Sequence, residues 1–141
     1  MKIYLASPFE KQPFMRVVRG HLQERGYEVT ADWLDEKTET GQDAALAQRD
    51  IAAIQAADVV VVYNPQEFRY SGTGGRHVEL GIALMLDKVV VLLGERSNVF
   101  HHLVLHRVET TVELYRLLDH LRLPRTTVLA TAAHDFLTHL E

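Results

Sequence analysis

Apolar residues occur along this chain in short continuous runs that alternate with stretches of helical spacing. The continuous runs predict buried strands at residues 3–6, 59–63 and 89–93, and two weaker runs predict strands at 27–33 and 103–108. Apolar positions spaced three and four apart predict helices at residues 13–25, 43–56, 74–86 and 111–121. The chain therefore reads as strands and helices in alternation.

This alternation predicts an α/β fold with a parallel sheet covered by helices on both faces. Right-handed connections favour five strands in the order 2-1-3-4-5, a flavodoxin-like or Rossmann-like three-layer sandwich. Residues 1–123 are expected to form this single domain. Residues 124–141 are expected to be a C-terminal helical appendage of the same domain, with a helix over 131–140.

Composition narrows the function classes. The 141 residues carry a net charge of −4, which gives no broad basic surface for a nucleic acid polymer. The chain has no cysteine, so disulfides and thiolate chemistry are excluded, and no apolar run is long enough to cross a membrane. The first residues start directly as a strand without the layout of a signal peptide, and we expect a cytoplasmic protein. His101, His102 and His106 do not make a convincing metal set, and no cofactor is expected.

Ligands of open α/β sheets bind outside the carboxyl ends of the strands, so the residues that follow the strands form the candidate site. They offer carboxylates, hydroxyls, backbone N–H groups and aromatic rings, which suit a sugar with an attached base and a phosphate. The expected members are Tyr4, Ser7, Phe9, Trp33, Thr73, Gly74, Gly75, Glu79 and Asn98.

Glu79 is the most informative of these residues, because it lies among Val78, Leu80 and Ile82 in the first turns of a predicted helix. A carboxylate in such a place is costly unless it has a partner or a task, which favours a nucleophile or general base. The alternative is an acid that is stabilised by the helix dipole. Gly74 and Gly75 allow backbone N–H groups to approach a ligand, but they match neither a dinucleotide nor a triphosphate motif.

Two other candidates have ordinary structural alternatives. On pattern alone, Asp50 reads as an exposed helix acid opposite Arg49, and Trp33 reads as a core or edge residue more readily than as a stacking platform.

Four segments in this order resemble the nucleoside 2-deoxyribosyltransferase-like superfamily, which includes the 2′-deoxynucleoside 5′-monophosphate N-glycosidases. They are the opening strand Lys2-Ile3-Tyr4-Leu5-Ala6-Ser7-Pro8-Phe9, the helix from Asp50 to Asp58, the stretch Gly75 to Gly81 with Glu79-Leu80-Gly81, and Lys88-Val89-Val90-Val91-Leu92-Leu93. The resemblance extends over about residues 1–121.

The resemblance implies an enzyme that acts on the N-glycosidic bond of (deoxy)nucleosides or their 5′-monophosphates through a covalent glycosyl-glutamate. Glu79 would be the nucleophile, Tyr4 its hydrogen-bonding partner, and Asp50 a sugar-binding or proton-transferring acid. Ser7 and Thr73 could bind a phosphate or a sugar hydroxyl. Transferases of the family often carry an aspartate six residues before the glutamate. This chain has Thr73 there, and a hydroxyl at this position looks more like the monophosphate hydrolases. The resemblance also implies a homo-oligomer, a dimer or larger.

Two alternatives stay open. Arg76 and His77 are bulky residues next to Glu79, which allows a nucleotide-binding or interaction module that has lost catalysis. The same bond chemistry would also serve a glycohydrolase that cleaves NAD.

Overall fold

The computed structural model describes residues 1–36, 44–66 and 74–122, and it contains one five-stranded parallel sheet. The strand order is β2-β1-β3-β4-β5, which confirms the predicted α/β topology. The strands are β1 (Lys2–Ala6), β2 (Glu28–Val29), β3 (Val59–Asn64), β4 (Val89–Gly94) and β5 (His106–Val108).

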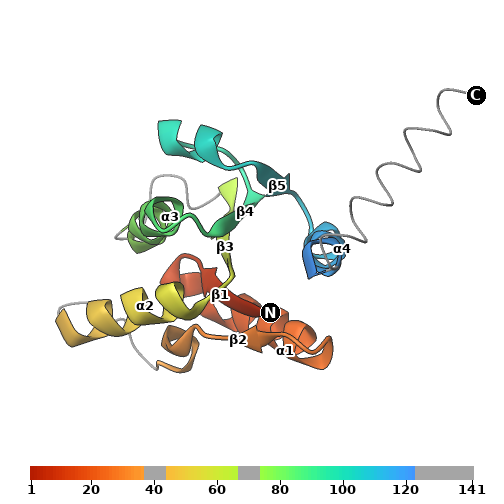
Figure 1. Cartoon of the computed structure of the whole chain (residues 1–141), viewed down its shortest axis with the longest axis horizontal. Helices are drawn as coiled ribbons and strands as arrows, with labels where there is room; N and C mark the ends of the chain where they lie inside the picture. Colours follow the sequence, from red (N-terminus) through yellow and green to blue (C-terminus); the bar gives the residue numbers. More distant parts are fainter. Residues whose placement is uncertain (37–43, 67–73, 123–141) are drawn as a thin grey trace, which may run out of the picture.

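Helices cover both faces of the sheet, as Figure 1 shows. The helices α2 (Ala44–Ala56) and α3 (Gly75–Met85) lie side by side on one face, and α1 (Gln12–Glu24) and α4 (Thr111–Arg122) lie on the other. Side chains join the second pair, because His21 Nδ1 lies 3.1 Å from the Tyr115 hydroxyl and Arg25 bonds Asp119 at 2.9 Å. Within the described ranges, the loops also contain the short 3-10 helices η1 (Phe9–Lys11), η2 (Asp32–Asp35) and η4 (Val99–Leu103).

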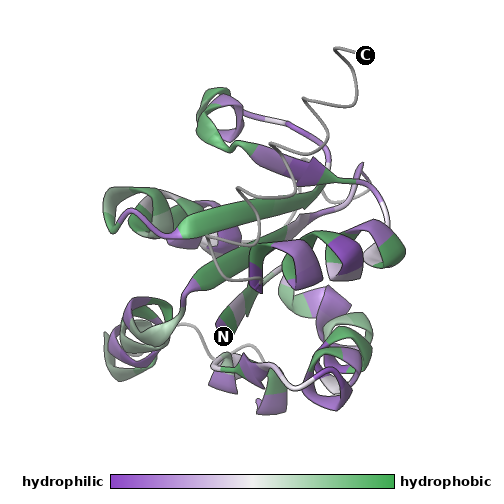
Figure 2. Ribbon diagram, turned by 45° about the vertical axis from the view of Figure 1, so that its right-hand side comes forward, coloured by the Kyte–Doolittle hydropathy of each residue, from purple (hydrophilic) through white to green (hydrophobic). Residues whose placement is uncertain are grey.

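The core is built from the central strands, which Figure 2 shows as the most hydrophobic part of the ribbon. Residues 3–6 of β1 and 59–62 of β3 are all buried, and they pair with each other in register from Ile3 with Val59 to Ala6 with Val62. Val and Leu on both faces of these strands match a sheet that is covered twice. The packing of these buried strands fixes the positions of the carboxyl ends of β1 and β3.

The second strand is shorter than the sequence predicts. Only Glu28 and Val29 pair with β1, and the chain then turns into η2 instead of continuing as a strand to residue 33. The Trp33 indole N–H donates to the carbonyl oxygen of Leu5 at 2.7 Å, which fixes this turn against β1. The alternation of apolar and polar residues over 27–33 does not mark the end of the strand, and the 3-10 turn that follows it buries the adjacent side chains of Trp33 and Leu34.

The fifth strand is also shorter than predicted. Residues 99–103 form η4, and the sheet pairing begins only at His106. The Asn98 side chain accepts from the backbone N–H groups of Phe100 and His101, which favours a helical turn over a strand at this point.

The predicted C-terminal helix over 131–140, and the appendage 124–141 that contains it, lie outside the described residues. Within the described ranges, none of the helices has both the length and the apolar character that a membrane span requires.

Gly94, the last residue of β4, has a φ of +119°, a conformation that glycine adopts far more easily than other residues. A β carbon at this position would lie 2.3 Å from the carbonyl oxygen of Asn64 on β3. Because that oxygen belongs to the backbone of a buried strand, it has little freedom to move away.

We therefore expect Gly94→Ala to lower the free energy of unfolding by at least about 2 kcal/mol, through backbone strain and the clash with β3. Urea unfolding followed by circular dichroism measures this change. Gly20→Ala is the matched control, because nothing lies within 4 Å of a β carbon there in α1, and alanine should be neutral or stabilising. Equal stability of the two variants would contradict the packing described here.

Candidate active site

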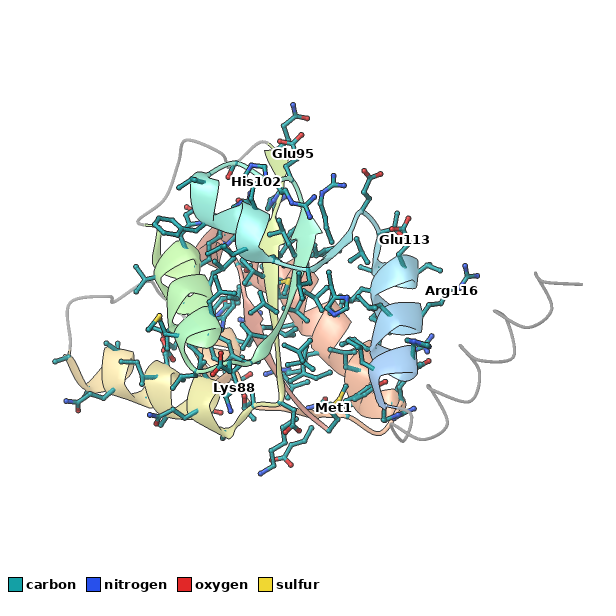
Figure 3. The ribbon with its side chains drawn as sticks, turned by 45° about the horizontal axis from the view of Figure 1, so that its top comes forward. Met1, Lys88, Glu95, His102, Glu113 and Arg116 are labelled. Carbon is teal, nitrogen blue, oxygen red and sulfur yellow. The ribbon has the colours of Figure 1, made fainter. Side chains whose placement is uncertain are left out.

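The candidate site lies at the carboxyl end of the sheet. Figure 3 shows this polarity, with Glu95, which follows β4, at one end of the molecule and Lys88, which precedes β4, at the other. The same end carries the residues that follow β1 and the N-terminus of α3, because all five strands run in parallel.

Tyr4 and Glu79 meet at this end of the sheet. The Tyr4 hydroxyl donates to Oε2 of Glu79, so a residue of the central strand β1 holds a carboxylate of helix α3, 75 positions further along the chain. The Tyr4 side chain is fully buried, and Glu79 is partly exposed. The predicted pairing of these two residues is therefore present in the geometry.

Burial is the main influence on the protonation of this pair. It raises the pKa of Glu79 to about 7, the Tyr4 hydrogen bond opposes that rise, and the charge of Asp50 adds to it. Burial and the neighbouring Glu79 charge also raise the pKa of Tyr4, which therefore stays a protonated donor. Glu79 thus changes its charge near neutral pH, as a nucleophile or general base that works there requires.

Glycine leaves space beside the carboxylate. Gly74 has a φ of +79° and is the residue that precedes α3, and Gly75 begins the helix. A β carbon at Gly75 would lie 3.9 Å from Oε1 of Glu79, so no side chain separates that oxygen from the start of the helix. A ligand that reaches Glu79 would also meet the backbone N–H groups and positive end of the helix.

Asp50 belongs to the same electrostatic environment, because its charge raises the pKa of both Tyr4 and Glu79. It is half-buried rather than an exposed helix acid. Arg49 donates to Oδ1 of Asp50 from both Nε and a terminal nitrogen, at 3.2 and 2.9 Å, and also bonds Glu36, which follows η2. Arg49 is a neighbour of the site to which the sequence analysis gave no role there.

The residues after β1 and β2 have internal partners. The Ser7 hydroxyl donates to the carbonyl oxygen of Pro8 at 2.9 Å, and the Phe9 ring lies 6.4 Å from the Trp33 ring. Trp33 is buried, and its indole N–H is already bonded to Leu5, as a core residue would be. Ser7 and Phe9 are partly exposed. Thr73 lies outside the described residues.

Arg76 does not point towards Glu79. Its guanidinium is buried and donates to the side-chain oxygen of Asn64 from two nitrogens, both at 3.2 Å. Asn64 in turn donates to the carbonyl oxygen of Glu95 at 2.7 Å and to the Ser97 hydroxyl at 2.9 Å. This network connects the end of β3, the start of α3 and the loop after β4.

His77 contacts η4 through His101. The Ser97 N–H donates to Nδ1 of His101, so the neutral ring carries its proton on Nε2, which lies 3.3 Å from Nδ1 of His77. Burial, with the nearby charges of His77 and Arg76, lowers the pKa of His101 to about 4. Asn98, a predicted substrate-binding residue, has its amide nitrogen 3.1 Å from Nε2 of His101. Nothing in the sequence pattern indicated this histidine pair.

No group of three or more His, Cys, Asp or Glu side chains within the described residues is placed to hold a metal ion.

Comparison with known proteins places this geometry in a wider context. The family model described as nucleoside 2-deoxyribosyltransferase matches residues 3–121. No curated protein matches the sequence.

Solved structures share the fold at low sequence identity. A 2-deoxyribosyltransferase from Bacillus psychrosaccharolyticus superposes with a TM-score of 0.68 at 22% identity, over 91% of this chain and 96% of that one. A CMP N-glycosidase from Clostridium botulinum gives a TM-score of 0.57 at 19% identity, over 84% and 98% of the two chains. A 2-deoxyribosyltransferase from Leishmania mexicana gives 0.53 at 20% identity, over 67% and 65%.

The raised pKa of Glu79 predicts a pH-dependent stability. The folded protein holds this proton up to about pH 7, whereas an unfolded carboxyl with its ordinary pKa of 4.5 loses it earlier, so the wild type loses stability as the pH rises between these values. Glu79→Gln removes that cost. We expect it to raise the free energy of unfolding by about 2–3 kcal/mol at pH 8 and by little at pH 4.5.

Denaturant unfolding at the two pH values measures the difference. The exposed Glu24 on α1 supplies the control Glu24→Gln, which should change stability little at either pH. A gain for Glu79→Gln that is the same at both pH values would contradict the assigned pKa.

Proposed function

The chain belongs to the nucleoside 2-deoxyribosyltransferase family, and we propose that it breaks the N-glycosidic bond of (deoxy)nucleosides or their 5′-monophosphates with Glu79 as the nucleophile. The observation that carries this proposal is the hydrogen bond from Tyr4 to Glu79 at the carboxyl end of the sheet. This bond orients the Glu79 carboxylate beside the start of α3, where Gly74 and Gly75 lie.

In the proposed first step, the ionised carboxylate of Glu79 attacks the anomeric carbon of the sugar. A bond forms between a carboxylate oxygen and C1′, and the electron pair of the C1′–N bond leaves with the nucleobase, which takes up a proton. Water, or a second base, then attacks C1′ from the other face and releases the carboxylate. Water gives hydrolysis, and a second base gives transfer.

Tyr4 supports the first step because its hydroxyl fixes the orientation of the nucleophile and offsets part of the cost of the buried charge. Asp50 is proposed to bind a sugar hydroxyl or to move a proton, because its charge reaches both members of the pair. Ser7, Phe9, Gly74 and Gly75 are proposed to contact the sugar, the base or a phosphate. Contacts of Trp33, Thr73 and Asn98 with substrate, and assembly as a homo-oligomer, stay predictions.

Glu79 must be ionised in order to attack, and its pKa lies near 7. The rate at limiting substrate should therefore rise as the pH increases through this value and then level off, as far as Glu79 controls it.

The test is release of free base from a panel of ribo- and deoxyribonucleosides, their 5′-monophosphates and NAD. We expect Glu79→Ala to lose at least about 10³-fold in kcat/KM on any substrate that the wild type cleaves, because no other carboxylate replaces the nucleophile. Glu24→Gln, an exposed acid on α1, should keep wild-type activity. Circular dichroism confirms that the inactive variant is folded.

Adding a second free base to the same assay separates the two outcomes of the reaction. A new nucleoside indicates transfer, and base release that is unaffected by the acceptor indicates hydrolysis. Full activity of Glu79→Ala on a cleaved substrate would overturn the proposal. Thermal stabilisation by a nucleotide that the wild type never cleaves would instead favour a binding module.

A further inference from the structure

Arg49 on α2 joins two acids that come from different parts of the chain. One terminal nitrogen of its guanidinium lies 2.9 Å from Oδ1 of Asp50 and also bonds Oε1 of Glu36, while Nε lies 3.2 Å from the same Asp50 oxygen. Asp50 lies on the same helix, and Glu36 follows η2 after the second strand. The arginine therefore connects α2 to the loop after β2 at the acid whose charge acts on the Tyr4–Glu79 pair.

The contact with Arg49 favours the ionised form of Asp50. Burial raises its pKa, and the neighbouring charges of Glu36 and Asp32 raise it further, while the hydrogen bonds and charge of Arg49 lower it. The exposed fractions of the Arg49 and Asp50 side chains are 30% and 27%, so solvent weakens this interaction only in part. The net result is a pKa of Asp50 above its ordinary value, and Arg49 limits this rise.

The charge of Asp50 matters because it acts on the proposed nucleophile. It raises the pKa of both Tyr4 and Glu79, and Arg49 acts on Tyr4 in the opposite direction. An arginine thus lowers the pKa of Asp50 against the effect of burial, whereas Glu79 bonds a phenol and changes its charge near pH 7. When two acids in one site have different environments, one of them can serve as an acid or an anion while the other serves as the nucleophile.

We propose that Arg49 is a positioning residue of the active site, which holds Asp50 ionised and oriented by bridging it to Glu36. This inference rests on the proposed function for its effect on turnover, but its effect on Asp50 itself does not depend on which substrate the protein cleaves.

An arginine suits this task better than a lysine. The guanidinium is planar and presents several N–H groups in fixed directions, so it bonds two carboxylates at once, and it stays protonated beside them. Its hydrogen bonds to Asp50 and Glu36 raise its own pKa against the opposing effect of burial. A neutral side chain at this position would leave Asp50 facing Glu36 and Asp32 without a balancing charge.

The experiment compares the wild type with Arg49→Met and Arg49→Gln in two measurements. The first is the carboxyl 13C NMR titration of Asp50 and Glu79 in the ligand-free protein. We expect the Asp50 midpoint to rise by about one pH unit in both variants, which is the expected effect of losing a partly solvated ion pair. Arg49→Gln keeps a polar side chain that can form hydrogen bonds, so the Asp50 titration can still be measured in this variant if the methionine variant does not fold.

The second measurement is kcat/KM for base release at a pH below and at a pH above the Asp50 midpoints that the titration gives. We expect about a tenfold loss relative to wild type below both midpoints, where the ionised fraction of Asp50 in the variants is lower, and a value close to wild type above both midpoints. A merely structural role would instead lower activity by a similar factor at both pH values.

Arg19→Met is the matched control. Arg19 also bonds an acid of η2, Asp35, at 2.9 Å, but Asp35 lies on the exposed surface. This variant should leave the Asp50 midpoint and the pH profile unchanged.

An Asp50 midpoint that is the same in the wild type and both Arg49 variants would overturn the proposal, whatever the activity. A loss of activity that does not depend on pH would also overturn it. If the wild type releases no base from any substrate, the proposed function fails, and the titration alone then decides the role of Arg49.

Discussion

A carboxylate next to the buried end of a parallel sheet depends on a hydrogen-bond donor, and in this chain the donor is Tyr4. Tyr4 lies in β1, a strand with a neighbour on each side, and its side chain is fully buried, so the position of its hydroxyl is set by the core of the molecule. Glu79 comes from α3, whose start is set by Gly74 in the left-handed conformation. The direction of the carboxylate therefore follows from the register of the sheet and from one glycine.

The same constraint explains the electrostatics of the site. A phenol that remains protonated stabilises the ionised form of Glu79, but burial costs more than this one bond returns, and the result is a pKa near 7. Asp50 differs because its partner is a full positive charge rather than a hydroxyl. Two carboxyl groups that influence one another thus acquire different properties from their partners, and neither needs a metal ion or a cofactor for this.

The strand order followed from the continuous apolar runs, which are a strong local signal, whereas the pairing of Tyr4 with Glu79 was implied by the family resemblance. Prediction from the sequence failed where a side-chain hydrogen bond replaced the expected pattern. The indole bond of Trp33 to β1 shortens the second strand, and the Asn98 cap turns part of the expected fifth strand into η4.

Arg49 was read as lying opposite Asp50, since adjacent residues on a helix point in different directions, but a long side chain curls back to its neighbour. Buried Arg76 gave no signal because its partner is an amide 12 positions earlier.

Asn64 receives Arg76 and donates to the chain after β4, so the loops that follow β3 and β4 share one anchor. Glu79 has a separate anchor on β1. The carboxylate of Glu79 and the loops after β3 and β4 are therefore held by separate contacts. Substitutions in these loops can change their shape while the Tyr4–Glu79 bond stays in place, so proteins with this architecture can vary their loops without moving the carboxylate.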